Sequence, residues 1–271
     1  MTKLRPYRFK RQQLAFPYML ITAALVIVPL FILLYYACTD YATGKVSLMN
    51  FAAFFIDREN TNLATLGRSF FMAFLTTVIC LGLGYPLAYV LSRSPFNRRG
   101  ILIMIFIMPM WINSLLRMFA VKNMMELFGV GSGFGAVLTG MVYDFFPFML
   151  LPLFTSLSNI DRSYDEASND LGATPLVTFI KVTLPLSVPG IISGVLMVFM
   201  PTISTFAVVE MLGSQDQNML GNLINENISF APTRNVGAAY AFILLILVAA
   251  TMLIANLAGG KQKGREAANL L

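Results

Sequence analysis

Asp144 is the residue whose chemistry stands out, because its carboxylate interrupts an apolar run between Tyr143 and Phe145. A carboxylate within a membrane span costs roughly a few kcal/mol, so it normally faces protein or water. Aromatic ring faces attract cations. We therefore expect Asp144 and Tyr143 to contact a cationic solute. The alternative is an ion pair within the protein, for instance between Asp144 and Arg117.

Glu210 is a second acid, placed toward the outer end of a later apolar run. A long amine with several charges would need carboxylates spaced along its path and aromatic walls between them, and the sequence offers both. Two alternatives stay open. Glu210 could mark the depth of the membrane interface, and Trp111 could be a packing residue or part of an interfacial aromatic belt.

Catalytic chemistry is not indicated by the composition. The chain has no histidine and two cysteines, so it lacks the commonest metal ligand and general base. The glycine-rich stretch 129–135 resembles a phosphate-binding loop only superficially, because no Gly-Lys-Ser/Thr follows it. We expect no catalytic residue, metal site or cofactor on this chain, which could not hydrolyse ATP alone. An intramembrane enzyme would need a nucleophile and base, or metal ligands, at helical spacing, and neither is found.

Long apolar runs must position these residues. Of the 271 residues, 57% are hydrophobic and 12% are charged, against about 25% charged in soluble domains. Residues 12–39, 69–92, 182–209 and 235–260 carry no charge, and each exceeds the roughly 20 residues that cross a bilayer. Two further runs, near 99–121 and 135–157, contain Arg117 and Asp144. We predict an all-α membrane protein with six transmembrane helices in one domain, 14–260, flanked by tails 1–13 and 261–271.

The basic residues predict the orientation. If the amino terminus is cytoplasmic, thirteen Lys and Arg residues lie inside and five outside, with Arg117 in a span. This agrees with the positive-inside rule and puts both termini, and the segment 161–185, in the cytoplasm. A DNA-binding role for the basic amino-terminal tail is the alternative, but we expect no nucleic-acid partner.

The segment 161–185 is the longest polar interruption between two apolar halves, and it is rich in helix signals. Ser163 and Glu166 have the spacing of a capping box, which predicts a helix beginning near Tyr164. Gly172 can adopt the left-handed conformation that ends such a helix. Thr174 followed by a proline predicts the start of a second helix.

Pro185 and Pro189 should stop this second helix before the next apolar run. Two short helices joined at a glycine corner would protrude where a simple hairpin between spans needs only a few residues. We interpret this shape as a docking element. In the alternative, Glu166 and Gly172 serve only to cap helices.

The segment resembles the cytoplasmic loop motif of importer permeases of ABC transporters. That motif reads Glu-Ala-Ala, three residues, Gly, nine residues, Ile, one residue, Leu-Pro. The matching residues are Glu166, Ala167, Gly172, Leu184 and Pro185. Ser168 replaces the second alanine, Val182 replaces the isoleucine, and Ala173 follows the glycine, as is common in that family. The resemblance implies that residues 158–185 form a coupling loop between the fourth and fifth spans, seated in a groove of a separate ATPase.

The whole chain is similar to permeases of the spermidine/putrescine importer family, of the PotB and PotH type. The resemblance is carried by Pro109-x-Trp111-x-Asn-Ser-Leu-x-Arg117, by residues 143–152 and by Pro189-Gly-Ile. It implies a substrate pathway at Asp144, Tyr143, Trp111, Phe206 and Glu210. Phe206 stands where the family has an adjacent aromatic pair, of which this chain has one member.

The resemblance also implies function and partners. The chain would be the permease subunit of an ATP-driven polyamine importer in the bacterial cytoplasmic (inner) membrane, working by alternating access. Its partners would be a PotC-like second permease, a homodimeric PotA-like ATPase that binds ATP and Mg²⁺, a PotD-like extracytoplasmic binding protein, and lipid. A different small solute, such as another amine or a sulfate-type anion, is the alternative cargo. An ion-coupled secondary carrier is less favoured, because it usually has an internal repeat and would leave the loop unexplained.

Overall fold

The computed structural model describes residues 11–56, 61–94, 100–214 and 217–268. Most of the predicted tail 1–13 and the end of the tail 261–271 therefore lie outside the described residues. The first half of the chain forms α1 (Arg11–Ala37), α2 (Met49–Phe55), α3 (Thr61–Arg93), α4 (Ile101–Ile107), the 3-10 helix η2 (Met108–Trp111), α5 (Ser114–Leu127) and α6 (Phe134–Ser158). The second half forms α7 (Ser163–Asp170), α8 (Pro175–Thr178), the π-helix η3 (Phe179–Thr183), α9 (Leu184–Ser204), α10 (Ala207–Leu212), α11 (Leu220–Ser229), the 3-10 helix η5 (Ala231–Thr233) and α12 (Arg234–Ala268).

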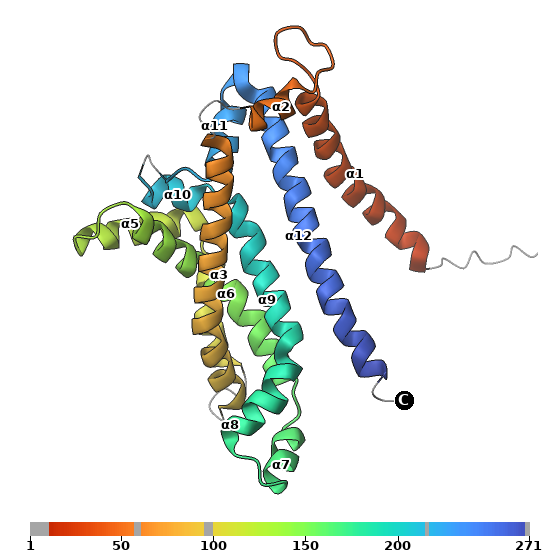
Figure 1. The fold of residues 1–271 in the computed structure, drawn as a ribbon, viewed down its shortest axis with the longest axis vertical. Coiled ribbons are helices and arrows are strands. Elements are labelled where there is room, and N and C mark those ends of the chain that lie inside the picture. Colours follow the sequence, from red (N-terminus) through yellow and green to blue (C-terminus); the bar gives the residue numbers. More distant parts are fainter. Residues whose placement is uncertain (1–10, 57–60, 95–99, 215–216, 269–271) are drawn as a thin grey trace, which may run out of the picture.

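Within the described residues, 5 helices are long and apolar enough to cross a membrane, and the number is 6 if a bent pair counts as one span. The bent pair is α4–η2 with α5, which meet at 97°. The expectation of one span running through Trp111 and Arg117 is thus corrected. The side chain of Asn113 accepts hydrogen bonds from the amides of Leu115 and Leu116, at 2.9 and 3.4 Å, so it caps a new helix. The chain turns there, and α5 projects sideways from the bundle (Figure 1).

Three helices, α3, α6 and α9, pack together as the core of the bundle (Figure 1). Met149, Leu150 and Leu153 of α6 are fully buried between their neighbours. Glycines permit the close approach of α9, since a Cβ on Gly190 would lie 2.3 Å from Ser156 Cβ. Small residues at such crossings let membrane helices pack at short distance.

Helix α1 leans away from this core and meets α12 near one end (Figure 1). Asn235 of α12 donates a hydrogen bond to the Thr39 carbonyl at 2.6 Å. Asn50, in α2, donates to the Ala37 carbonyl at 3.0 Å and to the Thr39 carbonyl at 2.8 Å. Between Tyr18 and Tyr36, α1 exposes many apolar side chains. The Asn50 and Asn235 bonds therefore hold α1 at its Ala37 end.

The prediction that Pro185 and Pro189 stop the loop's second helix is wrong. The chain continues from α8 through η3 directly into α9, and both prolines lie inside α9. Pro185 lies directly after the π-helix η3, and a local π turn is one of the adjustments by which a continuous membrane helix accommodates a proline. The amide of Leu184 donates to the Phe179 carbonyl, five residues back, which closes the wider π turn.

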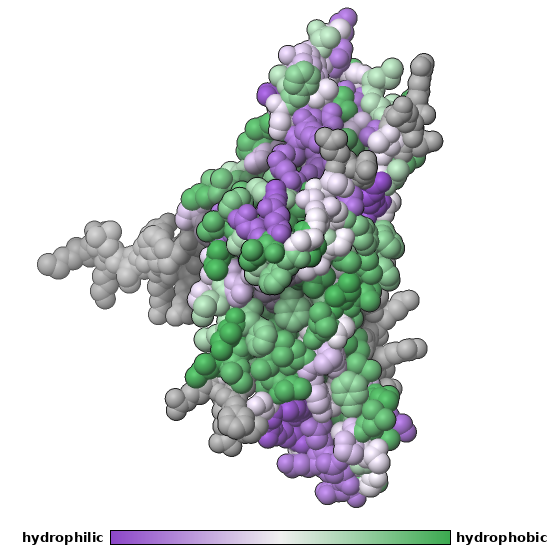
Figure 2. Space-filling view, turned by 90° about the vertical axis from the view of Figure 1, so that its left-hand side faces the viewer, coloured by the Kyte–Doolittle hydropathy of each residue, from purple (hydrophilic) through white to green (hydrophobic). Residues whose placement is uncertain are grey.

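The other end of α9 also differs from expectation, because it ends at Ser204 and Glu210 lies in the separate helix α10. Figure 2 shows an apolar band across the middle of the molecule, with hydrophilic residues gathered at the α7 end and at the opposite end. This banding fits a chain that spans a bilayer.

Candidate functional site

The α7–α8 loop forms one tip of the molecule (Figures 1 and 2). Helix α7 begins at Ser163, one residue before the predicted start. The predicted Ser163–Glu166 capping box is not formed. Instead, the Asp161 carboxylate accepts the Ser163 amide hydrogen at 2.9 Å. Hydrogen bonds from the Ser163 backbone and hydroxyl lower the pKa of Asp161 below its ordinary value.

Gly172 makes the corner between the two helices, with φ of +79°. The predicted left-handed conformation is therefore confirmed. Its amide donates to the Asn169 carbonyl at 2.8 Å, and the Ala173 amide donates to the Ser168 carbonyl at 3.1 Å. The Ser168 and Thr178 hydroxyls share a hydrogen bond at 2.9 Å, which ties α7 to α8. Serine in place of the motif's second alanine thus adds a link inside the loop.

The outward side of this loop is open. Glu166, Ala167 and Gly172 are exposed, and no heavy atom lies within 4 Å of where a Gly172 Cβ would be. Beside them Leu171 is 89% exposed and Leu176 is 67% exposed. A carboxylate, small residues and bare leucines on a polar tip make a surface that a partner's cation and apolar groove would complement.

The remaining residues of the predicted coupling set differ in exposure. Ala173 is half-buried beside the glycine corner, and Pro185 is exposed in the first turn of α9. Leu184 is half-buried and packs against the core cluster of α3, α6 and α9. The motif's carboxyl end is therefore the junction at which the loop joins the bundle.

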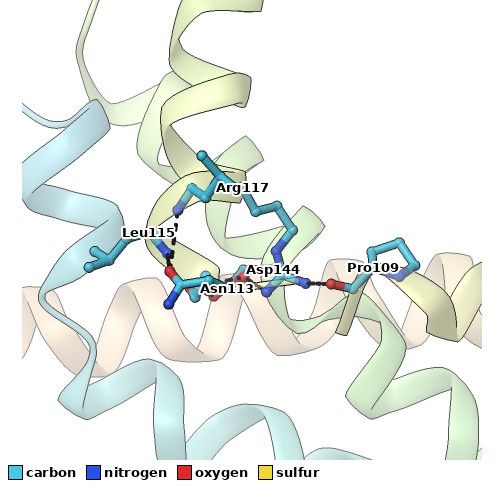
Figure 3. A network of polar contacts seen from close by, with 7 residues as sticks. Pro109, Asn113, Leu115, Arg117 and Asp144 are labelled. Atoms are coloured by element: carbon cyan, nitrogen blue, oxygen red, sulfur yellow. Dashed lines mark hydrogen bonds and ion pairs between the residues drawn. The ribbon is translucent and has the colours of Figure 1, made fainter. Parts of the chain in front are cut away.

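A buried polar cluster lies where α5 meets α6 (Figure 3). Arg117 forms an ion pair with Asp144, and each residue is 6% exposed. The ion pair that the sequence left as an alternative is therefore present. Arg117 Nη1 also donates to the Pro109 carbonyl at 2.6 Å, and the Ser114 hydroxyl lies 3.3 Å from Asp144 Oδ2.

The broken helix explains this cluster. The chain leaves helical geometry at Ile112, whose amide donates to the Pro109 carbonyl at 3.2 Å, and Arg117 reaches back from α5 to donate a second hydrogen bond to the same carbonyl. Its guanidinium also lies 5.8 Å from the centre of the Tyr143 ring. Sequence reasoning missed Ser114 and the Pro109 carbonyl. The only available signal was the Asn113-Ser114 pair, which is typical of a helix start.

Two cavities flank this cluster, of about 470 and 420 Å³, and Thr139 and Tyr143 line both. Met124 and Met125 line the first, and Phe106 and Phe146 line the second. Their walls are thus mainly apolar, with Tyr143, which is 41% exposed, offering a ring and a hydroxyl.

The other predicted substrate residues are not brought together with Tyr143 in these cavities. Trp111 is 83% exposed at the bend, and Phe206 is 40% exposed where α10 begins. Glu210 is exposed on α10, which packs against α5 and α6. Asp144 is turned toward Arg117, behind the cavity walls.

Comparisons with known proteins place the chain in a family. Residues 81–260 match the family model described as "binding-protein-dependent transport system inner membrane component". The spermidine/putrescine transport system permease protein PotB of Escherichia coli strain K12 is 35% identical over 202 residues, covering 68% of this chain and 73% of that protein. The PotB of Haemophilus influenzae is 34% identical over 229 residues, covering 73% of this chain and 80% of that protein.

Solved structures share the fold. A chain of a bacterial ABC transporter involved in the import of the acidic polysaccharide alginate superposes with a TM-score of 0.72 at 13% identity, over 92% of this chain and 94% of that one. A chain of the MetNI methionine ABC transporter superposes with a TM-score of 0.61 at 19% identity, over 74% of this chain and 95% of that one. The chain therefore belongs to the family of binding-protein-dependent transport system inner membrane components, as a non-catalytic multi-pass permease subunit of an ABC importer that works with an ATPase and a binding protein.

Proposed function

We propose that this permease subunit imports polyamines, spermidine or putrescine, and that its α7–α8 loop docks into the ATPase on the cytoplasmic side. The docking role rests on one observation, the exposed surface of Glu166, Ala167 and Gly172 around a left-handed glycine corner. The cargo is inferred from two PotB proteins that are 35% and 34% identical to this chain.

The transport cycle follows from this arrangement. A PotC-like second permease pairs with this chain, and a PotA-like ATPase dimer holds one coupling loop from each. ATP, bound with Mg²⁺ by the ATPase, closes that dimer and draws the loops together, so the spans rock and open outward to a PotD-like binding protein. Hydrolysis resets them and opens the cavity inward. Both termini lie in the cytoplasm.

Tyr143, Trp111, Phe206 and Glu210 are proposed to contact the cargo along this path. Each is at least partly exposed, and three are aromatic side chains that suit an ammonium group. Asp144 belongs to the same path, but in this structure its carboxylate is engaged by Arg117. Its charge therefore acts on the cargo only when that ion pair opens.

The test uses Gly172→Leu, with Gly44→Leu as a matched control. Both glycines have left-handed φ, +79° and +64°, and at neither position would a Cβ meet another atom within 4 Å. Both variants thus carry the same backbone strain, roughly 1–2 kcal/mol. Only Gly172→Leu places a bulky side chain on the docking surface, where overpacking costs roughly 1–3 kcal/mol, or about 5- to 150-fold in affinity.

The assay is ATPase co-purification with the full complex, followed by ATP-driven spermidine uptake into vesicles. We expect Gly172→Leu to lose both and Gly44→Leu to keep ATPase binding. If the two variants bound the ATPase and took up spermidine equally well, the α7–α8 loop would not be the docking element. If the wild-type complex took up sulfate but not spermidine when driven by ATP, the proposed polyamine cargo would be wrong and a sulfate-type anion would take its place.

A further inference from the structure

One face of α3 carries three residues at a spacing of four, Tyr85, Tyr89 and Arg93. Residues four apart lie above one another on a helix, so these side chains form a single stripe. The stripe covers the last turns of α3, at the end of the bundle that bears the α7–α8 loop (Figure 1). The transport scheme above assigns it no part.

The carboxyl end of the stripe is bonded to α7. Arg93 Nη1 lies 3.0 Å from Asp165 Oδ2, in the first turn of α7. Arg162, just before α7, donates to the Arg93 carbonyl at 3.3 Å. The last residue of α3 therefore contacts the loop through both its side chain and its backbone.

The rest of the stripe holds the junction between the loop and α9. Phe179 is the first residue of the π-helix η3, and its ring packs edge-on against Tyr85 and Tyr89 at centroid distances of 5.8 and 5.4 Å. The Tyr85 hydroxyl shares a hydrogen bond of 2.7 Å with the Ser187 hydroxyl in α9. π-Helical turns often occur at functional sites, and here one stands where the loop enters the bundle.

Stability alone does not explain the ion pair. The side chains of Arg93 and Asp165 are 18% and 27% exposed. Among the described residues, Arg93 Nε, Arg93 Nη2 and Asp165 Oδ1 are buried and have no hydrogen-bond partner. Buried polar atoms without partners cost free energy, so this contact between α7 and α3 is not the arrangement that stability would favour.

We propose that the Tyr85–Tyr89–Arg93 stripe is a third attachment of the loop, beside its covalent connections to α6 and α9, and that movement of α7 enters α3 through Arg93 and Asp165. Arg93 is then a positioning residue for transport. This inference rests on the proposed docking of the loop. It adds that α3, which packs against both α6 and α9, moves as one body with the docked loop.

The test is a charge exchange in the full complex, with Arg93→Glu and Asp165→Lys made singly and together. Each single variant puts like charges together, and we expect uptake per ATP hydrolysed to fall several-fold while the ATPase still co-purifies. The double variant restores opposite charges and should recover most of the ratio. The neutral variants Arg93→Gln and Asp165→Asn should lower the ratio less, and they serve if a reversed charge prevents folding.

The ratio of uptake to hydrolysis separates coupling from stability, because a merely less stable permease loses both in proportion. The inference would be overturned if the single and neutral variants took up as much substrate per ATP hydrolysed as the wild type. It would also be overturned if the double variant had a ratio no higher than the single variants. Failure of the wild-type chain to bind the ATPase would instead count against the proposed docking.

Discussion

Neutralising Arg117 and Asp144 separately and together tests what the buried cluster between α5 and α6 does. Arg117→Met leaves a buried carboxylate without its cation, and Asp144→Leu leaves a buried guanidinium without its anion. The double variant removes both charges and fills the space with apolar atoms. Both side chains are almost completely enclosed, at 6% and 9% exposure, so water cannot substitute for either lost partner.

The magnitude follows from this burial. Breaking a buried pair by removing one member costs about 3–5 kcal/mol, whereas replacing both members by apolar residues is often neutral. At roughly 2–4 °C per kcal/mol for a chain of this size, each single variant should lower Tm by roughly 6–20 °C. The Tm of the double variant should lie much closer to that of the wild type, because no charge is left unpaired.

The assay is the thermal unfolding of purified permease complexes in lipid nanodiscs, with uptake measured in parallel. Asp144→Asn is the control of matched shape, since its amide oxygen can still accept from Arg117. A normal Tm in Arg117→Met or Asp144→Leu, or a double variant whose loss equals the sum of the single losses, would refute the pairing argument. Normal Tm with lost uptake in Asp144→Asn would identify this carboxylate as a cargo ligand.

Two further predictions concern local geometry. Gly221→Ala should lower Tm by forcing apart α11 and the end of α9, because the new Cβ would lie 2.5 Å from the Ser204 carbonyl oxygen. Gly67→Ala is the control: its Cβ would have no neighbour within 4 Å, so Tm should stay unchanged or rise. The cap on α7 should persist below pH 3.8, the ordinary pKa of an aspartate, because hydrogen bonds from Ser163 lower the pKa of Asp161. This stability is present above the unfolded-state pKa and is lost as pH falls through the lowered one. Hydrogen exchange of the Ser163 amide should show it, and Asp161→Asn should abolish the pH dependence; opening of the cap at or above pH 3.8 would contradict the prediction.

Much of the fold follows from residue patterns that act locally. Uncharged runs predict the long helices because a bilayer leaves a chain few other ways to satisfy its backbone. Gly172 was predictable for a similar reason, since few other residues accept its φ. These features depend on neighbours in the sequence, which a single chain displays in full.

The missed features depend on distant partners or on ambiguous residues. Pro185 can either stop a helix or occupy its first turn, and the π turn closed at Leu184 decided the outcome. At the bend after Trp111, Arg117 donates from the next helix to the Pro109 carbonyl, which also accepts from the Ile112 amide. The contact of Arg93 with Asp165 joins elements that are far apart in the chain, and no local pattern marks it.

Among the described side chains, α1 is held at its Ala37 end, and this attachment has a mechanical consequence. A helix of 27 residues is about 40 Å long at 1.5 Å per residue, so a tilt of about 10° about the Asn50 and Asn235 bonds displaces the far end by about 7 Å. Tilting is how membrane helices adjust to bilayers thicker or thinner than themselves. We therefore expect this subunit to match membranes of different thickness by tilting its first helix, with little change in the packing of α3, α6 and α9.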